Sequence, residues 1–338
     1  MQIFPQADEG KFGSYTVIMN NQLVNKLKLN KLFKSEDSRF ILLTALKISL
    51  VYFICALIVF YLVWLVLSVN NVFFEANSFF NFKGMESAFF DYVIDKIISQ
   101  NASYAFIFFV LLFFAGIYLA KILLRPFSKI GEFCESAAEN KNEIYNPDLF
   151  SDFKLLTRFS EFFFLYIRDS RVDKKFTKNT IPPVFTKVHG PVFDRVFFFH
   201  FSLFLSIIAI CSSMFITFIT VEAYNSIIEL AVTSIDKNGK EIAYFLKNQE
   251  YLFESIQHIT IGTLLVVYAI LAFHLYGRVS GAVFGYFSTM RSFMKGNRKA
   301  RIHLVGYPHI RPYSRAFNKY LDLVCREIDN DEGKKKKE

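Results

Sequence analysis

Long uninterrupted apolar runs dominate this 338-residue chain. Four runs of about 20 or more residues contain no Asp, Glu, Lys or Arg: 48–67, 97–120, 196–221 and 255–277. At 1.5 Å per helical residue, each run is long enough to cross a hydrocarbon core of roughly 30 Å. The pattern therefore predicts four membrane-spanning helices, and the overall content of 53% hydrophobic residues agrees with a membrane protein.

A second pattern follows the second and fourth runs, where apolar residues recur every three or four positions. In the first half these residues are Phe127, Ile130, Cys134 and Ala137, then Leu156, Phe159, Phe163 and Tyr166. In the second half they are Val283, Tyr286, Met290 and Phe293, then Ile310, Tyr313, Phe317 and Tyr320. This spacing places the members of each set on one helix face and predicts the core of a helical bundle.

The two halves share one order of elements: span, short outer loop, span, amphipathic helix, polar connector, amphipathic helix. The equivalent seams lie 156 residues apart for the first amphipathic helix and 154 for the second. An internal duplication is the simplest explanation. The connectors contain Asn, Gly and Pro, together with isolated apolar residues that we expect to pin them to the bundle: Ile144, Leu149, Ile302 and Leu304. Because a pinned connector spans the length of a helix, the two helices of each unit can run parallel.

Charge sets the expected orientation. Segments 1–47, 121–195 and 278–338 carry 7, 13 and 14 of the 39 Lys and Arg residues. The positive-inside rule therefore places both termini and the middle segment in the cytoplasm. The net charge of +9 is then a signal of topology and of attraction to anionic lipid, and we expect no nucleic-acid partner.

At this point the residues resemble a known family. A span leading into two amphipathic helices, with proline at the start of the first and two apolar pins in the connector, is similar to the HAMP domain of bacterial transmembrane signalling proteins. Pro126 stands at the position of the family's proline, and Phe127, Ile130, Leu156 and Phe159 stand in its core. The resemblance covers roughly 121–169 and 277–325. It implies parallel helices that pair into a four-helix coiled coil and transmit movement of the spans.

The second unit departs from the family pattern. It has Gly281 or Ala282 where proline is expected, and the acidic residue that opens the second helix is at best Asp152 in the first unit. The units are therefore divergent, and their seams are unusually aromatic.

The expected fold is an all-α membrane protein with four transmembrane helices in two duplicated halves, each followed by a HAMP-like pair of parallel cytoplasmic helices. The expected segments are a cytoplasmic N-terminal segment 1–40, hairpins 41–120 and 196–277, HAMP-like units 121–170 and 278–326, a linker 171–195 and a basic, solvated tail 327–338. Because each unit supplies only two helices, we expect the two units to pair within one chain, with a homodimer as the alternative.

The exits from the spans are the expected relay joints. Pro126 would set the direction of a new helix, or would be a plain helix breaker. Gly277, Gly281 and Gly285 would permit close helix approach, or would loosen the exit in place of proline. The predicted bundle core comprises Phe127, Ile130, Leu156, Phe159, Phe163, Val283, Tyr286, Met290, Tyr313, Phe317 and Tyr320.

No catalytic signature is present: the chain has no phosphate-binding glycine loop, no zinc-protease helix and no nucleophile elbow. We expect no enzyme activity, no cofactor and no metal. The favoured function is a non-enzymatic relay in the bacterial inner membrane that couples conformational state to a separate partner protein. A structural or assembly subunit of an envelope complex is the alternative. A small transporter component is the third and least favoured possibility, because the four apolar runs contain no acidic residue.

Overall fold

All secondary structure in the computed structural model is helical over the residues that it describes, so the predicted all-α class is confirmed for them. These residues are 35–76, 85–140, 143–146, 153–176, 181–188, 190, 194–234, 244, 247 and 250–335. In chain order the helices are α2 (Glu36–Ala76), α3 (Met85–Glu139), α4 (Lys154–Val172), α5 (Pro183–Thr186), α6 (Arg195–Ser234), α8 (Glu250–Met294), the 3-10 helix η1 (Pro308–Ile310) and α9 (Arg311–Lys335).

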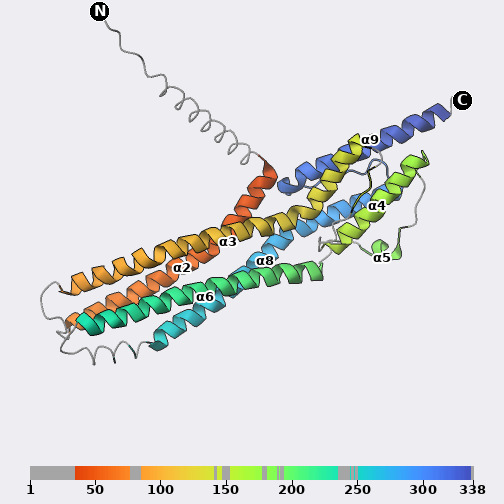
Figure 1. Cartoon of the computed structure of the whole chain (residues 1–338). Coiled ribbons are helices and arrows are strands. Elements are labelled where there is room, and N and C mark those ends of the chain that lie inside the picture. Colours follow the sequence, from red (N-terminus) through yellow and green to blue (C-terminus); the bar gives the residue numbers. More distant parts are fainter. Residues whose placement is uncertain are drawn as a thin grey trace, which may run out of the picture.

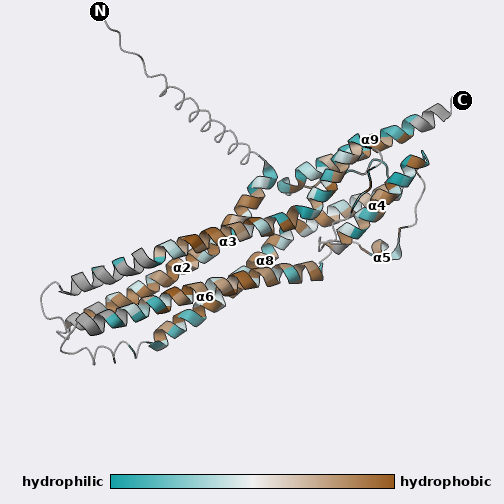
Figure 2. Ribbon diagram, in the orientation of Figure 1, coloured by the Kyte–Doolittle hydropathy of each residue, from teal (hydrophilic) through white to brown (hydrophobic). Residues whose placement is uncertain are grey.

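Four helices, α2, α3, α6 and α8, are long and apolar enough to cross a membrane. They run side by side along an elongated molecule (Figure 1), and hydrophobic residues line their central portions (Figure 2). By length and composition the chain is thus a multi-pass membrane protein. Most of the predicted outer loop between α6 and α8 lies outside the described residues.

The spans form two hairpins, because α2 packs against α3 and α6 packs against α8. The first hairpin is tight at Gly116, where an ideal Cβ would lie 2.6 Å from Ala45 Cα. This distance is far below van der Waals contact, so only glycine fits between the two backbones. The hairpins also bond to each other: the Tyr268 hydroxyl donates to the Ile48 carbonyl oxygen over 2.8 Å.

Short polar residues cap the first span of each hairpin. Ser35 Oγ accepts the amide of Ser38 at 3.3 Å, and Asp194 Oδ1 accepts the amide of Phe197 at 3.2 Å. Such side chains satisfy amides that have no partner inside the helix. Both α2 and α6 therefore begin at defined positions, at the end of the molecule where the amphipathic helices lie (Figure 1).

The second span of each hairpin does not stop at the predicted exit. α3 runs without interruption to Glu139 and contains Pro126 in its interior. The expectation that a separate helix starts at Pro126 is therefore wrong. The proline lacks the N–H that would bond the Ile122 carbonyl, and loss of this bond bends a helix without ending it where other contacts hold the next turns. α3 changes direction toward its C-terminal end (Figure 1).

α4 and α9 complete a group of four parallel helix segments that we call the bundle: residues 121–139 of α3, α4, residues 278–294 of α8, and α9. α4 begins beside the spans, where the rings of Phe153 and Phe197 are stacked with centroids 3.9 Å apart. Its last turn lies beside the C-terminal half of α9, where Arg171 pairs with Glu327. α9 continues to Lys335, so most of the segment predicted as a tail is helical.

Candidate functional site

The bundle core is formed by the two periodic seams. All but one of their sixteen residues are buried, with relative exposures of 5% or less. The exception is Tyr313, which is partly exposed. Of the residues predicted for the core, the buried ones are Phe127, Ile130, Leu156, Phe159, Phe163, Val283, Tyr286, Met290, Phe317 and Tyr320. A contiguous apolar core therefore extends beneath the spans.

Aromatic contacts in this core join the two halves of the chain. The rings of Phe127 and Tyr286 have centroids 5.3 Å apart, and Tyr286 lies 5.6 Å from Phe317. Phe163 and Phe317 lie 5.7 Å apart. These last two residues are separated by 154 positions, which is the repeat offset of the second helix, so equivalent residues meet at an approximate twofold axis. In this structure, aromatic rings from the two halves therefore pack against each other.

The bundle helices pair between halves. α9 packs along α3 at Gly131, where an ideal Cβ would lie 3.3 Å from Tyr313 Cβ. The equivalent contact in the other half joins α4 to α8, where the rings of Phe159 and Phe287 are 4.6 Å apart. Gly131 corresponds to Phe287 and Tyr313 to Phe159 under the repeat offsets. The duplication therefore repeats the contact with different residues: glycine against tyrosine in one place and phenylalanine against phenylalanine in the other.

Two further stacks connect the first spans to the bundle. Near the start of α2, Phe40 stacks on His309 with centroids 4.2 Å apart and ring planes 11° apart. Near the start of α6, Phe197 stacks on Phe153 at 3.9 Å. The two stacks occupy corresponding places in the two halves: Phe197 lies 157 positions after Phe40, and His309 lies 156 positions after Phe153, two more than the 154-residue offset of the second helix. We call these two contacts the cross-half stacks, because each joins the first span of one half to the start of the second bundle helix of the other.

Polar contacts reinforce the stack at α2. Arg311 pairs with Glu36 at 3.1 Å, and the Tyr313 hydroxyl donates to Asp37 Oδ2 at 3.3 Å. His309 Nε2 lies 3.3 Å from the Arg278 carbonyl oxygen. Burial is the main cause that lowers the pKa of His309 below its ordinary value. Burial, followed by the Asp37 carboxylate, raises the pKa of Tyr313 to about 12.

The membrane-distal part of the bundle contains an ion pair between equivalent helices. Arg171 of α4 donates to Glu327 of α9 through Nε at 3.0 Å and through Nη2 at 2.9 Å. Its Nη1 reaches the Ala137 carbonyl oxygen of α3 at 3.5 Å. The guanidinium also lies over the Tyr320 ring, 5.7 Å from its centroid. One side chain thus links three of the four bundle helices.

Among the buried hydroxyls that lack a hydrogen-bond partner in the described residues, that of Tyr286 lies at the centre of the bundle. Tyr286 is fully buried between Phe127 and Phe317, and its hydroxyl oxygen is unpaired. A buried polar group without a partner costs about 1–3 kcal/mol. Nearby, Ser160 Oγ lies 3.9 Å from the thioether sulfur of Met290, which is a weak acceptor. The centre of the bundle therefore contains a buried hydroxyl that forms no hydrogen bond with the described residues.

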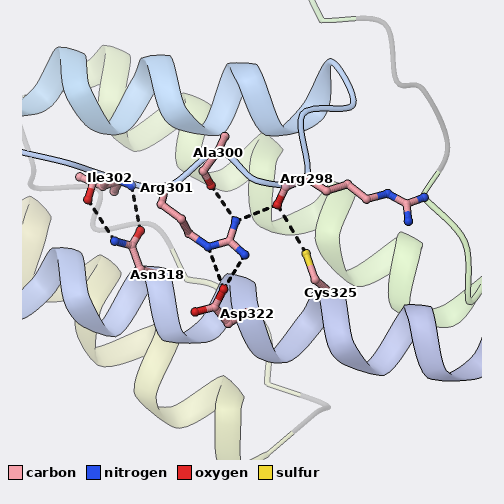
Figure 3. A network of polar contacts seen from close by, with 7 residues as sticks. All are labelled: Arg298, Ala300, Arg301, Ile302, Asn318, Asp322 and Cys325. Atoms are coloured by element: carbon pink, nitrogen blue, oxygen red, sulfur yellow. Dashed lines mark hydrogen bonds and ion pairs between the residues drawn. The ribbon is translucent and has the colours of Figure 1, made fainter.

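The second connector is held to α9 by side chains (Figure 3). Asn318 accepts the amide of Ile302 at 2.9 Å and donates to the carbonyl of the same residue at 3.0 Å. Arg301 pairs with Asp322 at 2.5 Å and also bonds the carbonyl oxygens of Arg298 and Ala300. Ile302 is buried, so this predicted pin packs as expected.

The first connector differs from the prediction. Ile144 is 65% exposed and pins nothing, while Leu149 lies outside the described residues. The neighbouring Tyr145 packs in its place, with its ring 5.1 Å from Phe133 and 4.7 Å from Phe164. Tyr145 faces the bundle, whereas Ile144, one position earlier, faces solvent.

The predicted relay joints occupy different environments. Pro126 is buried inside α3. Gly281 and Gly285 face the second connector, since an ideal Cβ would lie 2.0 Å from the Tyr307 hydroxyl and 2.6 Å from Leu304 Cδ2, respectively. Gly277 has open space around it. Of the three glycines, two therefore permit close approach of the connector and none permits close approach of a neighbouring helix.

The sequence pattern did not predict five residues that matter in the structure. Gly116 is one glycine within an apolar run and has no local signature. Phe40 and His309 stack although they are far apart in the chain, and so do Phe153 and Phe197. The repeat offset could have revealed them, because an aromatic ring precedes the second bundle helix in both halves.

Within the described ranges, no group of three or more His, Cys, Asp or Glu side chains is arranged to hold a metal ion. Comparison of the chain with protein-family models, curated proteins and solved structures gives no match. Statements about the function of this chain therefore rest on its geometry alone.

Proposed function

We propose that this protein is a non-enzymatic relay that couples the arrangement of its membrane spans to its bundle, and through the bundle to a separate partner protein. In this proposal the bundle is a divergent, intramolecular HAMP-like unit on the cytoplasmic side of a bacterial inner membrane. The observation that carries the proposal is the pair of cross-half stacks, at Phe40 and His309 and at Phe153 and Phe197.

The stacks support a relay because they give each bundle helix a direct link to the spans. α3 and α8 continue from spans into the bundle, while α4 and α9 are joined to the spans through the stacks. A displacement of either hairpin therefore acts on helices of both halves. Packed interfaces of this kind respond by shifting between discrete arrangements of about 1–2 Å.

The unpaired Tyr286 hydroxyl would favour any second arrangement in which it gains a hydrogen-bond partner. Its desolvation cost lowers the stability of the present packing relative to one in which a rotated helix brings the hydroxyl to a partner or to water. If the bundle were only a static docking platform, an unpaired hydroxyl in its core would lower its stability without serving its function.

The experiment perturbs the spans and observes the bundle. Gly116→Ala forces α2 and α3 apart, because its Cβ meets Ala45 Cα. Gly262→Ala is the matched control, since Gly262 lies in a span with open space around it. Spin labels at Val172 and Arg326, both exposed on the bundle surface, report the distance between α4 and α9. The four native cysteines are replaced first.

We expect Gly116→Ala to shift the label distance by about 1–2 Å and Gly262→Ala to leave it unchanged. A second label pair at Leu43 and Tyr118, both exposed, reports the separation of α2 and α3 directly. If that separation changes while the bundle distance stays constant, the spans and the bundle are uncoupled. The bundle would then be a structural docking platform, and the relay proposal would be refuted.

A further inference from the structure

A cluster of basic side chains lies on the surface of the spans, where α2 of the first half meets α8 of the second. Lys47 Nζ lies 3.4 Å from His274 Nε2, and Arg278 follows His274 by one helical turn. His274 and Arg278 are both exposed. Toward the centre of the spans, the neighbouring surface is apolar and exposed, with Leu50 at 40% and Ile270 at 63%. The cluster therefore lies at the bundle-side edge of the apolar belt.

The two cations of this cluster have no carboxylate partner in the part of the chain that the structure describes. Neither Lys47 nor Arg278 forms an ion pair there, whereas Arg171, Arg298, Arg301 and Arg311 do. Within the described residues, the Lys47 ammonium lies within hydrogen-bond distance of His274 Nε2, and the backbone carbonyl of Arg278 contacts the His309 ring. Neighbouring positive charges create a local positive potential, which favours the binding of an anion.

The surface between these side chains is open. Gly277 follows His274 by three residues and precedes Arg278, and an ideal Cβ on it would meet no atom within 4 Å. No side chain from Gly277 therefore shields the space between the imidazole and the guanidinium. A ligand can approach the helix backbone at this point.

The duplication does not produce this cluster. The equivalents of Lys47 and His274 at the 156-residue offset are Leu203 and Tyr118, which belong to the seam between α3 and α6. That seam is apolar at this level, with the rings of Tyr118 and Phe204 6.2 Å apart. The basic cluster therefore occurs where α2 meets α8 and has no equivalent where α3 meets α6. A general excess of positive charge at the span ends would not produce this difference.

We propose that Lys47, His274 and Arg278 bind a phosphate group, and that its source is the headgroup of an anionic phospholipid. Lysine, histidine and arginine all donate hydrogen bonds to phosphate oxygens, and charge assistance strengthens these bonds. The position at the edge of the apolar belt is the level at which headgroups lie, so the acyl chains would extend along the exposed apolar surface of α2 and α8. The bound lipid would bridge the two halves of the chain.

The test uses the full chain purified in neutral detergent, with bound lipid counted by native mass spectrometry. Phosphatidylglycerol is the anionic probe, phosphatidylcholine is the zwitterionic probe, and inorganic phosphate is added as a competitor. The variant is Lys47→Gln with Arg278→Gln. The matched control, Lys121→Gln with Arg195→Gln, removes the same charge from exposed positions on the other two spans. Lys47→Arg with Arg278→Lys keeps the charge and checks that substitution alone is tolerated.

We expect one phosphatidylglycerol to bind with a preference over phosphatidylcholine that falls by about tenfold or more in the Lys47→Gln, Arg278→Gln variant. The control and the charge-keeping variant should retain the preference. Equal loss in the control, or no preference in the unmodified chain, would overturn the site. If inorganic phosphate at low millimolar concentration displaced the bound phosphatidylglycerol, the site would bind phosphate groups in general. The proposal that a lipid headgroup is the ligand would then be overturned. The outcome is independent of whether the bundle relays movement.

Discussion

Two rings in equivalent positions, His309 and Phe153, show how the duplicated halves have diverged. Both stack on the first span of the other half, but only His309 carries a titratable group. Because burial lowers the pKa of His309, the folded chain resists protonation that the unfolded chain accepts at about pH 6.5. The stability contributed by the neutral ring is therefore complete above pH 6.5 and is lost as the pH falls through the lowered folded-state pKa.

His309→Phe should reduce this acid sensitivity. The substitution copies the ring that the other half uses, so stacking on Phe40 is kept while the titratable group is removed. We expect the melting temperature of the variant in detergent to fall less between pH 7 and pH 5 than that of the unmodified chain. His303→Gln is the control, because His303 is exposed in the same connector region. An unchanged pH profile in His309→Phe would show that the acid sensitivity arises elsewhere.

Among the helices, α4 and α9 are linked by the Arg171–Glu327 pair, whose side chains are 11% and 28% exposed. A second pair, Arg298 with Asp329, lies on the bundle surface with exposures of 41% and 58%. Partial burial protects the first pair from solvent screening, whereas exposed pairs contribute little.

Double-mutant cycles with alanine should separate the two pairs. We expect a coupling free energy of about 1.5–3 kcal/mol for Arg171 with Glu327, because this pair makes two charge-assisted hydrogen bonds. For Arg298 with Asp329 we expect less than about 1 kcal/mol. Chemical unfolding of the purified chain measures both values. Comparable coupling in the two pairs would mean that burial does not distinguish them.

Sequence pattern predicted the spans and most of the seam burial, because a membrane helix and an a/d seam each arise from residues close together in the chain. It failed where distant contacts decide the outcome. Pro126 suggests a helix start, yet the helix continues through it, with Phe127 and Ile130 fully packed in the bundle. Tyr145 replaces Ile144 as the connector pin because the groove beside Phe133 and Phe164 accepts a ring.

The same limit applies to the candidate site. The bundle residues could be read from periodicity, but the partners of Phe40 and Phe153 belong to the other half of the chain. Gly116 has a role only because Ala45 of the neighbouring helix lies against it. Such contacts depend on how the hairpins pack, which no local pattern encodes.

For the molecule as a whole, the central prediction is that the two halves pair within one chain. Gly131→Cys with Tyr313→Cys tests it, because the two Cβ atoms would lie about 3.3 Å apart, close to the separation in disulfides. In a background without native cysteines, oxidation should give a cross-linked monomer. Gly277→Cys with Tyr313→Cys is the control and should not cross-link, since Gly277 has open space around it. A cross-linked dimer as the main product would instead establish pairing between two chains.

The stack between Phe40 and His309 also has a consequence during synthesis. Some 270 residues separate the two rings, and a ribosome adding about 5–20 residues per second needs roughly 13–54 s to make that stretch. In the later part of this interval, once residue 166 has been made, the aromatic seam of the first unit still lacks the partner residues of the second half. A nascent chain paused or cut in the second half would present that seam to chaperones and proteases. Correct assembly therefore requires that the first half be kept from aggregation until the last helix emerges.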